Sequence, residues 1–294
     1  MNITSDWIRQ VELGKQPSKG ALQRHLNEVH GKNPGFTETI ASNCRDIYGN
    51  SSYDLLLNFL DKDNDSDVLD IACGSGFLLN LCHNRLGVGS KLTGIDMSSS
   101  ELNLARKKLK HTNIKLHLGL AQDLSFLKES SFDVILCHWA LTLMDPVVPV
   151  FNSIKRLLKN KGLFAAIIDG DINTAPEYLK IHNIIYKYVQ LEYTNYGMIE
   201  LGDARVRNSK ELKKLALKTF YDSKVTITEH LLYFHDYPRS LARKVAGFFY
   251  ASFVLSVKGH KRMLIELEKH FSSKLSNGLG SFIMPVNCIC IKKN

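Results

Sequence analysis

The feature that most limits the fold of this chain is a short apolar run that ends in a glycine-rich turn. Residues 68–72 are apolar except for Asp70. Gly74 and Gly76 follow this run, and residues 77–86 carry apolar side chains at helical spacing. A short apolar run bounded by turn residues predicts a buried strand. Glycines let the backbone turn sharply and approach a ligand closely. We therefore expect a strand, a turn and a helix in succession here.

The same alternation continues along the chain. Further strands are expected at residues 92–96, 114–118, 132–137 and 163–168, with helices at 53–60, 98–110 and 209–220. Ser98 and Glu101 have the spacing of a capping box that opens the second of these helices. Another helix is expected to begin at Asp145, with Asp145 as N-cap and Pro146 at the first helical position, and to end at Gly162. Strands that alternate with helices predict an α/β fold with a Rossmann-like, mostly parallel sheet and helices on both faces.

Other segments interrupt or flank this pattern. The helix after residue 172 is introduced by Thr174 and Glu177, which have capping-box spacing, and residues 238–276 are helical and aromatic. Such insertions suit a lid over an apolar pocket, although aromatic side chains at helical spacing equally suit an ordinary core. The expected organisation is an N-terminal helical segment (1–60), a Rossmann-like core (61–171), a helical lid insertion (172–207), a core continuation (208–236), a second helical lid insertion (237–281) and a last core strand (282–294).

Three features converge on one edge of the predicted sheet. Ligands of an open α/β sheet bind outside the carboxyl ends of its strands. The glycine turn lies there, Asp96 follows it at the spacing typical of a carboxylate that binds ribose, and residues 120–123 come after the third strand. The third glycine of a dinucleotide motif is replaced by Leu79. Asp70 can hold an ammonium group, which S-adenosylmethionine has and NAD lacks, so the first cofactor is favoured.

Four ordered motifs carry a resemblance to a known family. They are Val68-Leu-Asp-Ile-Ala-Cys-Gly-Ser-Gly76, Gly94-Ile-Asp-Met-Ser98, Phe132-Asp-Val-Ile135 and Leu157-Leu-Lys-Asn-Lys-Gly162. This order resembles class I S-adenosylmethionine-dependent methyltransferases, and most of all the ubiquinone/menaquinone-methyltransferase-like group of small-molecule enzymes. The resemblance covers roughly residues 66–171, and it is specific for fold and cofactor rather than for substrate.

The resemblance implies a role for each matching position. The glycines would line the methionine moiety, Asp96 would bind both ribose hydroxyls, Met97 would pack on adenine, and His138 would lie beside the transferred methyl group. Leu120 departs from the family, which has Asp or Asn there, so Asp123 is the candidate replacement contact to adenine. The implied cofactor-binding residues are Asp70, Ala72, Gly74, Gly76, Asp96, Met97, Leu120, Ala121, Gln122, Asp123, Cys137 and His138.

Catalytic and substrate-binding residues are less constrained by the sequence. A base is needed only if the acceptor keeps its proton, and His138 is the first candidate, with simple contact to the cofactor or the backbone as the alternative. His182 and His235 are weaker candidates, and Asp169 and Asp171 could orient the substrate. Candidate substrate contacts are Trp139, Tyr48, Tyr178, His182 and Phe249, and the stretch with Arg45, Tyr48 and Tyr53 could close the other side of the cofactor.

Composition and charge limit the classes of partner, the metal content and the location that can be expected. The chain of 294 residues has a formal net charge of +9, but its basic residues are spread over predicted helices, which disfavours a nucleic-acid partner without excluding one. The six cysteines form no C-x-x-C pair, so no metal site and no disulfide framework are expected. No apolar run is long enough to span a bilayer, and residues 1–10 lack the apolar core of a secretion signal, so a cytoplasmic location is expected. The oligomeric state stays open.

These observations lead to one functional hypothesis and two alternatives. The chain is expected to transfer a methyl group from S-adenosylmethionine, leaving S-adenosylhomocysteine, to an oxygen, nitrogen or carbon of a small or medium-sized molecule, with secondary metabolism as one setting. The first alternative is a methyltransferase that acts on RNA or protein, which the positive charge supports. The second is a regulator that binds the cofactor without catalysis.

Overall fold

The structure, a computed structural model, describes residues 3–18 and 20–294 and divides the chain into two compact units. The part of unit 1 that is described comes from residues 3–18 and 20–49, 172–201 and 231–285. Unit 2 comprises residues 50–171, 202–230 and 286–294. Both units are therefore assembled from separate stretches of sequence. Residues 50–60 belong to unit 2, which differs from the boundary at residue 60 expected from the sequence.

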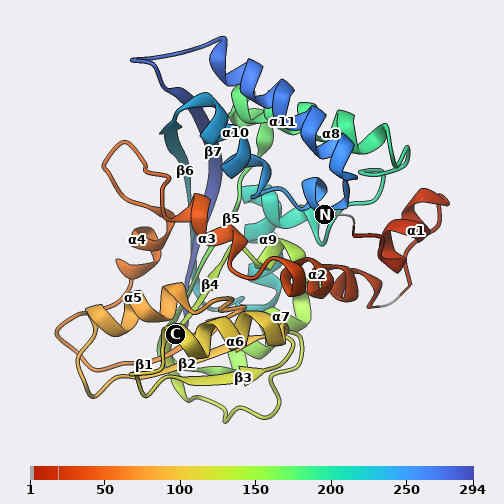
Figure 1. The fold of residues 1–294 in the computed structure, drawn as a ribbon. Helices are drawn as coiled ribbons and strands as arrows, with labels where there is room; N and C mark the ends of the chain where they lie inside the picture. Colours follow the sequence, from red (N-terminus) through yellow and green to blue (C-terminus); the bar gives the residue numbers. More distant parts are fainter. Residues whose placement is uncertain (1–2, 19) are drawn as a thin grey trace. The chain divides into compact units, whose positions relative to one another are not determined.

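Unit 2 is built on a seven-stranded sheet with the order β3-β2-β1-β4-β5-β7-β6 (Figure 1). Strands β1 to β5 pair in parallel, and β7 is antiparallel to β5, with Leu163 opposite Lys292. This arrangement confirms the predicted Rossmann-like α/β class. The strands are β1 (Asp67–Ile71), β2 (Lys91–Asp96), β3 (Lys115–Leu118), β4 (Phe132–His138), β5 (Leu158–Asp169), β6 (Lys224–Asp236) and β7 (Gly280–Lys292), the last two of which run from one unit into the other.

Helices cover both faces of the sheet because side chains alternate along each strand. Leu69 and Ile71 of β1 point into a buried cluster that includes residues of α7 (Val148–Leu157) and α9 (Ser209–Thr219). The opposite face meets α5 (Phe77–Arg85), since a Cβ on Gly94 of β2 would lie 2.5 Å from Leu79 Cδ1. The remaining helical elements of unit 2 are α4 (Ser52–Leu57), α6 (Ser99–Lys108), η1 (Leu141–Leu143) and η3 (Ala204–Arg207).

The helix expected to run from Asp145 to Gly162 is shorter than predicted at both ends. Helix α7 begins at Val148 after Val147, without a side-chain cap, and Pro149 takes the place in the first turn that was assigned to Pro146. Proline suits the first turn because its missing N–H is not needed there. Gly162 does not end a helix but lies within β5, where a Cβ would be 2.9 Å from the carbonyl oxygen of Lys159. Close backbone approach, not helix capping, requires this glycine.

Three other predicted helices also have different bounds. Helix α8 (Pro176–Gln190) starts after Ala175, and Thr174 provides no cap, because a proline again occupies the first turn. The short helix expected at 53–60 is α4, whose N-cap Ser51 forms a capping box with Asp54. The helical stretch expected at 238–276 consists of α10 (Pro238–Ala246), η4 (Tyr250–Val254) and α11 (Val257–Ser272).

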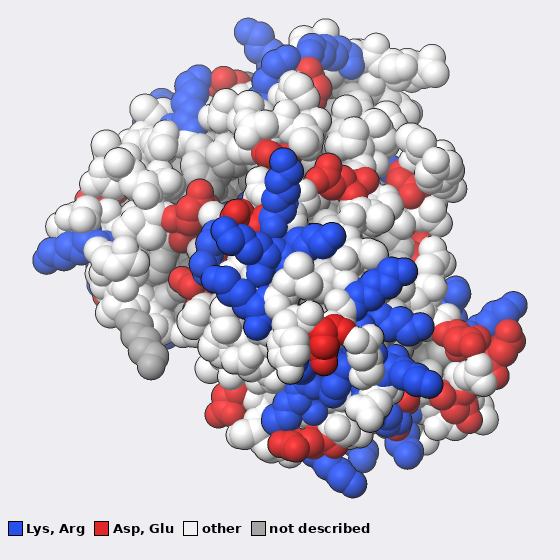
Figure 2. All heavy atoms as spheres, turned by 180° about the vertical axis from the view of Figure 1, so that it is seen from behind, with Lys and Arg blue, Asp and Glu red and all other residues white. Residues whose placement is uncertain are grey.

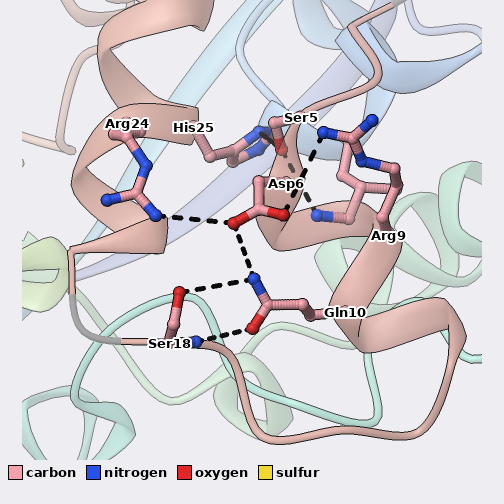
Figure 3. A network of polar contacts seen from close by, with 8 residues as sticks. Ser5, Asp6, Arg9, Gln10, Ser18, Arg24 and His25 are labelled. Carbon is pink, nitrogen blue, oxygen red and sulfur yellow. Dashed lines mark hydrogen bonds and ion pairs between the residues drawn. The ribbon is translucent and has the colours of Figure 1, made fainter.

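Unit 1 is mainly helical. Its further helices are α1 (Asp6–Glu12), α2 (Ala21–Lys32), α3 (Phe36–Ala41) and η2 (Ile172–Thr174). Figure 3 shows how polar side chains join α1, the loop that follows it and α2: Asp6 accepts hydrogen bonds from Gln10 and Arg24, and the Gln10 amide contacts Ser18. Ser5 caps α1 by accepting from the Ile8 N–H.

Two chemical features of the described residues complete the fold. All six cysteines are free thiols. Within residues 3–18 and 20–294, no helix has both the length and the apolar character needed to cross a bilayer.

Candidate cofactor site

The glycine-rich turn leaves β1 with three residues in left-handed backbone conformation. Ala72, Gly74 and Gly76 have φ angles of 59°, 50° and 78°. Such angles are costly for a residue with a side chain, and outliers of this kind cluster at binding sites. At Gly76 a side chain is also excluded by packing, since a Cβ would lie 2.8 Å from Leu109 Cδ1. The turn therefore brings bare backbone to the start of α5, where free N–H groups can face a ligand.

Asp96 holds the turn in place from the end of β2. One carboxylate oxygen accepts the Gly74 N–H at 2.9 Å, and the other accepts the Ser98 N–H at 2.8 Å. The Gly119 N–H bonds the Asp96 carbonyl, which ties the end of β3 to the same point. A carboxylate oxygen can accept more than one hydrogen bond. Asp96 can therefore keep both backbone contacts and still accept the two hydroxyls of a ribose.

Asp70 is a buried carboxylate at the carboxyl end of β1. It is 1% exposed, and neither of its side-chain oxygens has a hydrogen-bond partner among the described residues. Burial, and secondarily the nearby charge of Asp96, raises the pKa of Asp70 well above its ordinary value. An uncompensated buried carboxyl is costly. It becomes favourable when a cation binds beside it, so this residue fits the ammonium group of S-adenosylmethionine.

Glu101 is a third buried carboxylate at the turn, although its position in the sequence predicts only a role in capping α6. It is 2% exposed, and its Oε2 lies 3.8 Å from the position that a Cβ of Gly74 would take. Ser98 does accept the Glu101 N–H, as its cap spacing predicted. A helix cap leaves its glutamate near solvent, so only burial could have revealed this residue. Asp70, Asp96 and Glu101 give the site an acidic character that suits a cationic ligand.

Residues 120–123 follow β3 as a turn in which the Asp123 N–H bonds the Leu120 carbonyl. Leu120 and Asp123 are exposed, Ala121 is buried, and Gln122 is half-buried. The Asp123 carboxylate accepts hydrogen bonds from Ser125, which lower its pKa. Half-buried Met97 follows Asp96 directly. The two turns place all the predicted nucleoside contacts next to the ends of β2 and β3.

His138 ends β4 and is held on two sides. Its Nε2 lies 2.9 Å from Ser52 Oγ, and its ring stacks on Tyr53 with centroids 4.0 Å apart. Burial lowers the pKa of His138 to about 3, so the imidazole is neutral at physiological pH. Ser52, which is fully buried at the first turn of α4, was missed by the sequence analysis because it lies in no motif and contacts His138 across 86 positions.

The neighbours of His138 differ in what they offer the site. Cys137 packs into the hydrophobic cluster between the sheet and α7, so only its backbone is available to a ligand. Burial raises the pKa of its thiol to about 12. Trp139 has a φ of 52°, and its ring lies against His138 with centroids 4.7 Å apart. Ala72 and Trp139 thus place left-handed backbone after two paired strands, β1 and β4.

The other candidate residues fall in both units. Tyr178, His182 and Phe249 form an aromatic cluster in unit 1, where Tyr178 and Phe249 have centroids 5.5 Å apart and His182 stacks on Tyr186. In unit 1, Tyr48 and His235 are exposed. The backbone of Arg45 forms an isolated β-bridge with that of Tyr233 in the same unit. In unit 2, Tyr53 is buried, Asp169 lies 3.9 Å from Arg207 Nε, and Asp171 is exposed.

The fold is that of a Rossmann-like protein, and the predicted cofactor-binding residues lie at the carboxyl ends of its parallel strands. The chain belongs to the methyltransferase domain family, whose model matches residues 62–215. The cofactor of this family is S-adenosylmethionine, as the sequence analysis predicted. Among the described residues, no group of three His, Cys, Asp or Glu side chains is placed to hold a metal ion.

Curated relatives agree with this membership over part of their length. A demethylmenaquinone methyltransferase from Listeria welshimeri is 28% identical over 127 residues, which is 42% of this chain and 53% of that protein. One from Staphylococcus haemolyticus is 26% identical over 156 residues, which is 53% of this chain and 61% of that protein. The alignments thus span little more than half the length of these relatives.

Solved structures extend the likeness of fold to most of the chain. The YcgJ protein from Bacillus subtilis matches with a TM-score of 0.54 at 15% identity, covering 83% of this chain and 98% of that one. The (4+2)-cyclase SpnF matches with a TM-score of 0.53 at 13% identity, covering 100% of this chain and 97% of that one. A fold shared with a cyclase shows that the architecture by itself does not specify the reaction.

Proposed function

We propose that this chain transfers the methyl group of S-adenosylmethionine to a small or medium-sized molecule. The observation that carries the proposal is Asp70: a buried carboxyl without a partner among the residues described, beside a backbone turn that accepts no side chain at Gly76. The buried carboxyl is costly unless a cationic ligand makes contact with it. A neutral or anionic cofactor would leave Asp70 uncompensated.

Each residue has a defined part in this proposal. Asp70 binds the ammonium group, the backbone of residues 72–76 supports the methionine portion, and Asp96 accepts the ribose hydroxyls. Leu120, Ala121, Gln122, Asp123 and Met97 surround the adenine. Bound S-adenosylmethionine supplies an electrophilic methyl group on a sulfonium centre. The protein contributes position and exclusion of water, as is general for cofactor enzymes.

His138 acts in this proposal as a fixed, neutral hydrogen-bonding group and not as a strong base. A group with a pKa of about 3 removes a proton from a hydroxyl or an ammonium only weakly. The bond to Ser52 and the stack on Tyr53 fix the ring orientation. The acceptor therefore arrives with an available lone pair or as an ionised oxygen or carbon. Trp139 is the adjacent apolar contact for it.

The relatives support a small-molecule acceptor. They are named as methyltransferases of demethylmenaquinone, and we propose an acceptor of related character, aromatic and largely apolar, with oxygen, nitrogen and carbon all open as the acceptor atom. The aromatic cluster of Tyr178, His182 and Phe249 is a candidate contact for such a molecule, as is Tyr48. Secondary metabolism stays one setting for the reaction. The free thiols support a cytoplasmic location for the protein.

The cofactor is tested by calorimetric titration of the protein with S-adenosylhomocysteine and, separately, with NAD. We expect micromolar binding of the first and none of the second. Asp70→Asn, which keeps the shape and removes the charge, is expected to weaken binding of S-adenosylmethionine, because the ammonium group loses its counter-charge. Binding of NAD, or of neither compound, contradicts the proposal.

The reaction is tested by incubation with S-adenosylmethionine that carries a labelled methyl group. We expect label in a quinol or phenol acceptor and none in bulk RNA or protein. Label in RNA or protein supports the alternative class of acceptor. Tight cofactor binding without label in any acceptor supports the second alternative, a regulator that binds the cofactor without catalysis.

A further inference from the structure

Helix α9 presents a basic face that the proposed methyl transfer does not use. Its 11 residues bury Leu212, Leu215 and Ala216 in the cluster beneath the sheet. The opposite side carries exposed lysines at helical spacing, with Leu217 between them. In the view from behind, Lys and Arg side chains gather over this helix (Figure 2). The exposed lysines are Lys210, Lys213, Lys214 and Lys218.

The lysines of this face lack acidic partners. Glu211 is the one acidic residue within α9, and it pairs with Lys214 at 3.7 Å. Lys210, Lys213 and Lys218 form no ion pair with any residue in the part of the chain that is described. Helix α11 is different, because Glu266 and Glu268 lie among its cations and Glu266 pairs with Lys187 at 3.0 Å. The positive potential of α9 is therefore left uncompensated.

The same side chains line a shallow hollow of about 500 Å³. Its walls are the four lysines and Leu217, and most of the lining is apolar because the methylene stems of the lysines form it. Leu217 is 37% exposed at its centre. Long lysine stems lie along apolar surface while their ammonium groups reach outward. A surface of this kind combines an apolar floor with a ring of positive charge.

We infer that the basic face of α9 docks the protein on an anionic lipid surface. Lysine ammonium groups are compact, strongly hydrated charges that suit a diffuse layer of lipid phosphates. Recognition of RNA instead favours arginine forks and aromatic rings on which bases stack, and this face has neither. The exposed Leu217 can meet the boundary between headgroups and acyl chains. The buried side of α9 stays in the core, so docking needs no unfolding.

This docking surface is independent of the methyl transfer reaction. The lysines project from the outer side of a helix whose inner side packs on the core, so they are not part of the edge that holds Asp70 and Asp96. Removal of their charge is therefore expected to leave affinity for S-adenosylhomocysteine unchanged. Failure of the proposed function would not affect the docking surface, and the two can be judged separately.

The test is cosedimentation of the full chain with vesicles of phosphatidylcholine, with and without phosphatidylglycerol. The variant replaces Lys210, Lys213, Lys214 and Lys218 by Gln. Its matched control replaces Lys258, Lys261, Arg262 and Lys269 by Gln, which removes the same four charges from α11. The two variants reduce the formal net charge of +9 equally, so they separate a local face from the overall charge.

We expect wild type and the α11 variant to bind the anionic vesicles and the α9 variant to bind about 600-fold more weakly, since each of the four lysines near such a surface contributes about five-fold. Binding is expected to fall with added salt. Unchanged circular dichroism and unchanged affinity for S-adenosylhomocysteine establish that the α9 variant is folded. Equal loss in both variants, equal binding to neutral vesicles, or transfer of wild type from the vesicles to a short RNA overturns the inference.

Discussion

Each of the two units contains a histidine whose pKa is strongly lowered by burial, and these two residues have similar surroundings. In unit 1, His25 Nδ1 lies 2.9 Å from Ser5 Oγ (Figure 3). The ring of His25 stacks on Trp7. In unit 2, His138 Nε2 lies 2.9 Å from Ser52 Oγ and its ring stacks on Tyr53. Burial lowers the pKa of His25 to about 4 and that of His138 to about 3. Local chemistry alone does not distinguish them.

Their positions in the fold do distinguish them. His138 ends β4, which pairs with β1 and its Asp70, and Asp96 ends β2 on the other side of β1. Ligands of such a sheet bind at the carboxyl ends of these parallel strands. His25 lies inside α2 and packs between helices. A histidine with a shifted pKa is therefore evidence for a functional site only when the fold places it where other functional groups converge.

The strongest test of this comparison replaces one carboxylate in each unit. Asp96 accepts two backbone N–H groups in unit 2, and Glu12 accepts those of Thr194 and Asn195 in unit 1. Asp96→Ala is expected to weaken binding of S-adenosylhomocysteine by about 1000-fold, or about 4 kcal/mol, because two charge-assisted hydrogen bonds to ribose are lost.

Glu12→Ala is its control. It also frees two backbone donors, so it is expected to lower the melting temperature without changing the affinity measured by calorimetry. Similar affinity losses in the two variants would show that Asp96 acts only through stability.

The second prediction concerns acid. Both histidines have a folded-state pKa below the unfolded value of 6.5, so the unfolded chain takes up protons first as the pH falls. Stability is therefore lost below pH 6.5, and the loss from each histidine is roughly 3 kcal/mol at pH 4. Replacement of either residue by Gln is expected to flatten the dependence of the unfolding free energy on pH between 6.5 and 4.

Urea unfolding at a series of pH values measures this effect. His138→Gln is expected to alter methyl transfer as well, whereas His25→Gln alters stability alone. A pH dependence that stays as steep as that of wild type in both variants would rule out the histidines as its source.

The third prediction compares two glycines with positive φ. A Cβ added at Gly76 would lie within 3.1 Å of atoms of Leu109 and Ala105, whereas one added at Gly14 in unit 1 would meet nothing within 4 Å. Gly76→Ala is expected to cost about 2 kcal/mol of stability, from backbone strain and overpacking, and to weaken cofactor binding. Gly14→Ala is expected to cost about 1 kcal/mol, from backbone strain alone. Thermal unfolding of both variants checks the order, and equal losses of stability would show that packing at Gly76 relaxes freely.

The smallest expected effects come from the two serines. Ser52→Ala and Ser5→Ala each remove the hydroxyl that contacts a histidine, at a cost of about 1 kcal/mol in stability. Ser52→Ala is also expected to lower kcat several-fold, with little change in the KM for the cofactor, because the His138 ring loses one of its two supports. Ser5→Ala should leave kcat unchanged. Steady-state kinetics at constant pH measure both, and equal kcat in the two variants would assign Ser52 a purely structural role.

The sequence alone determined the class of fold and predicted which residues meet at the proposed cofactor site. Strand and helix periods are local properties, and the glycine turn and Asp96 lie within one strand-turn-helix-strand unit, so their spacing suffices to bring them together. Local signals failed where a proline competed with a polar cap, at Asp145 and Thr174, and where Gly162 served close packing in a strand.

Only the tertiary structure decided which groups are buried and what they contact. Three features of the site depend on residues that are distant in the sequence. They are the burial of Asp70 without a partner among the described residues, the approach of Glu101 to the turn and the hydrogen bond between Ser52 and His138. The uncompensated lysines of α9 likewise required knowledge of which of its faces the core covers. Burial and long-range contact arise from packing of the whole chain, and no local pattern encodes them.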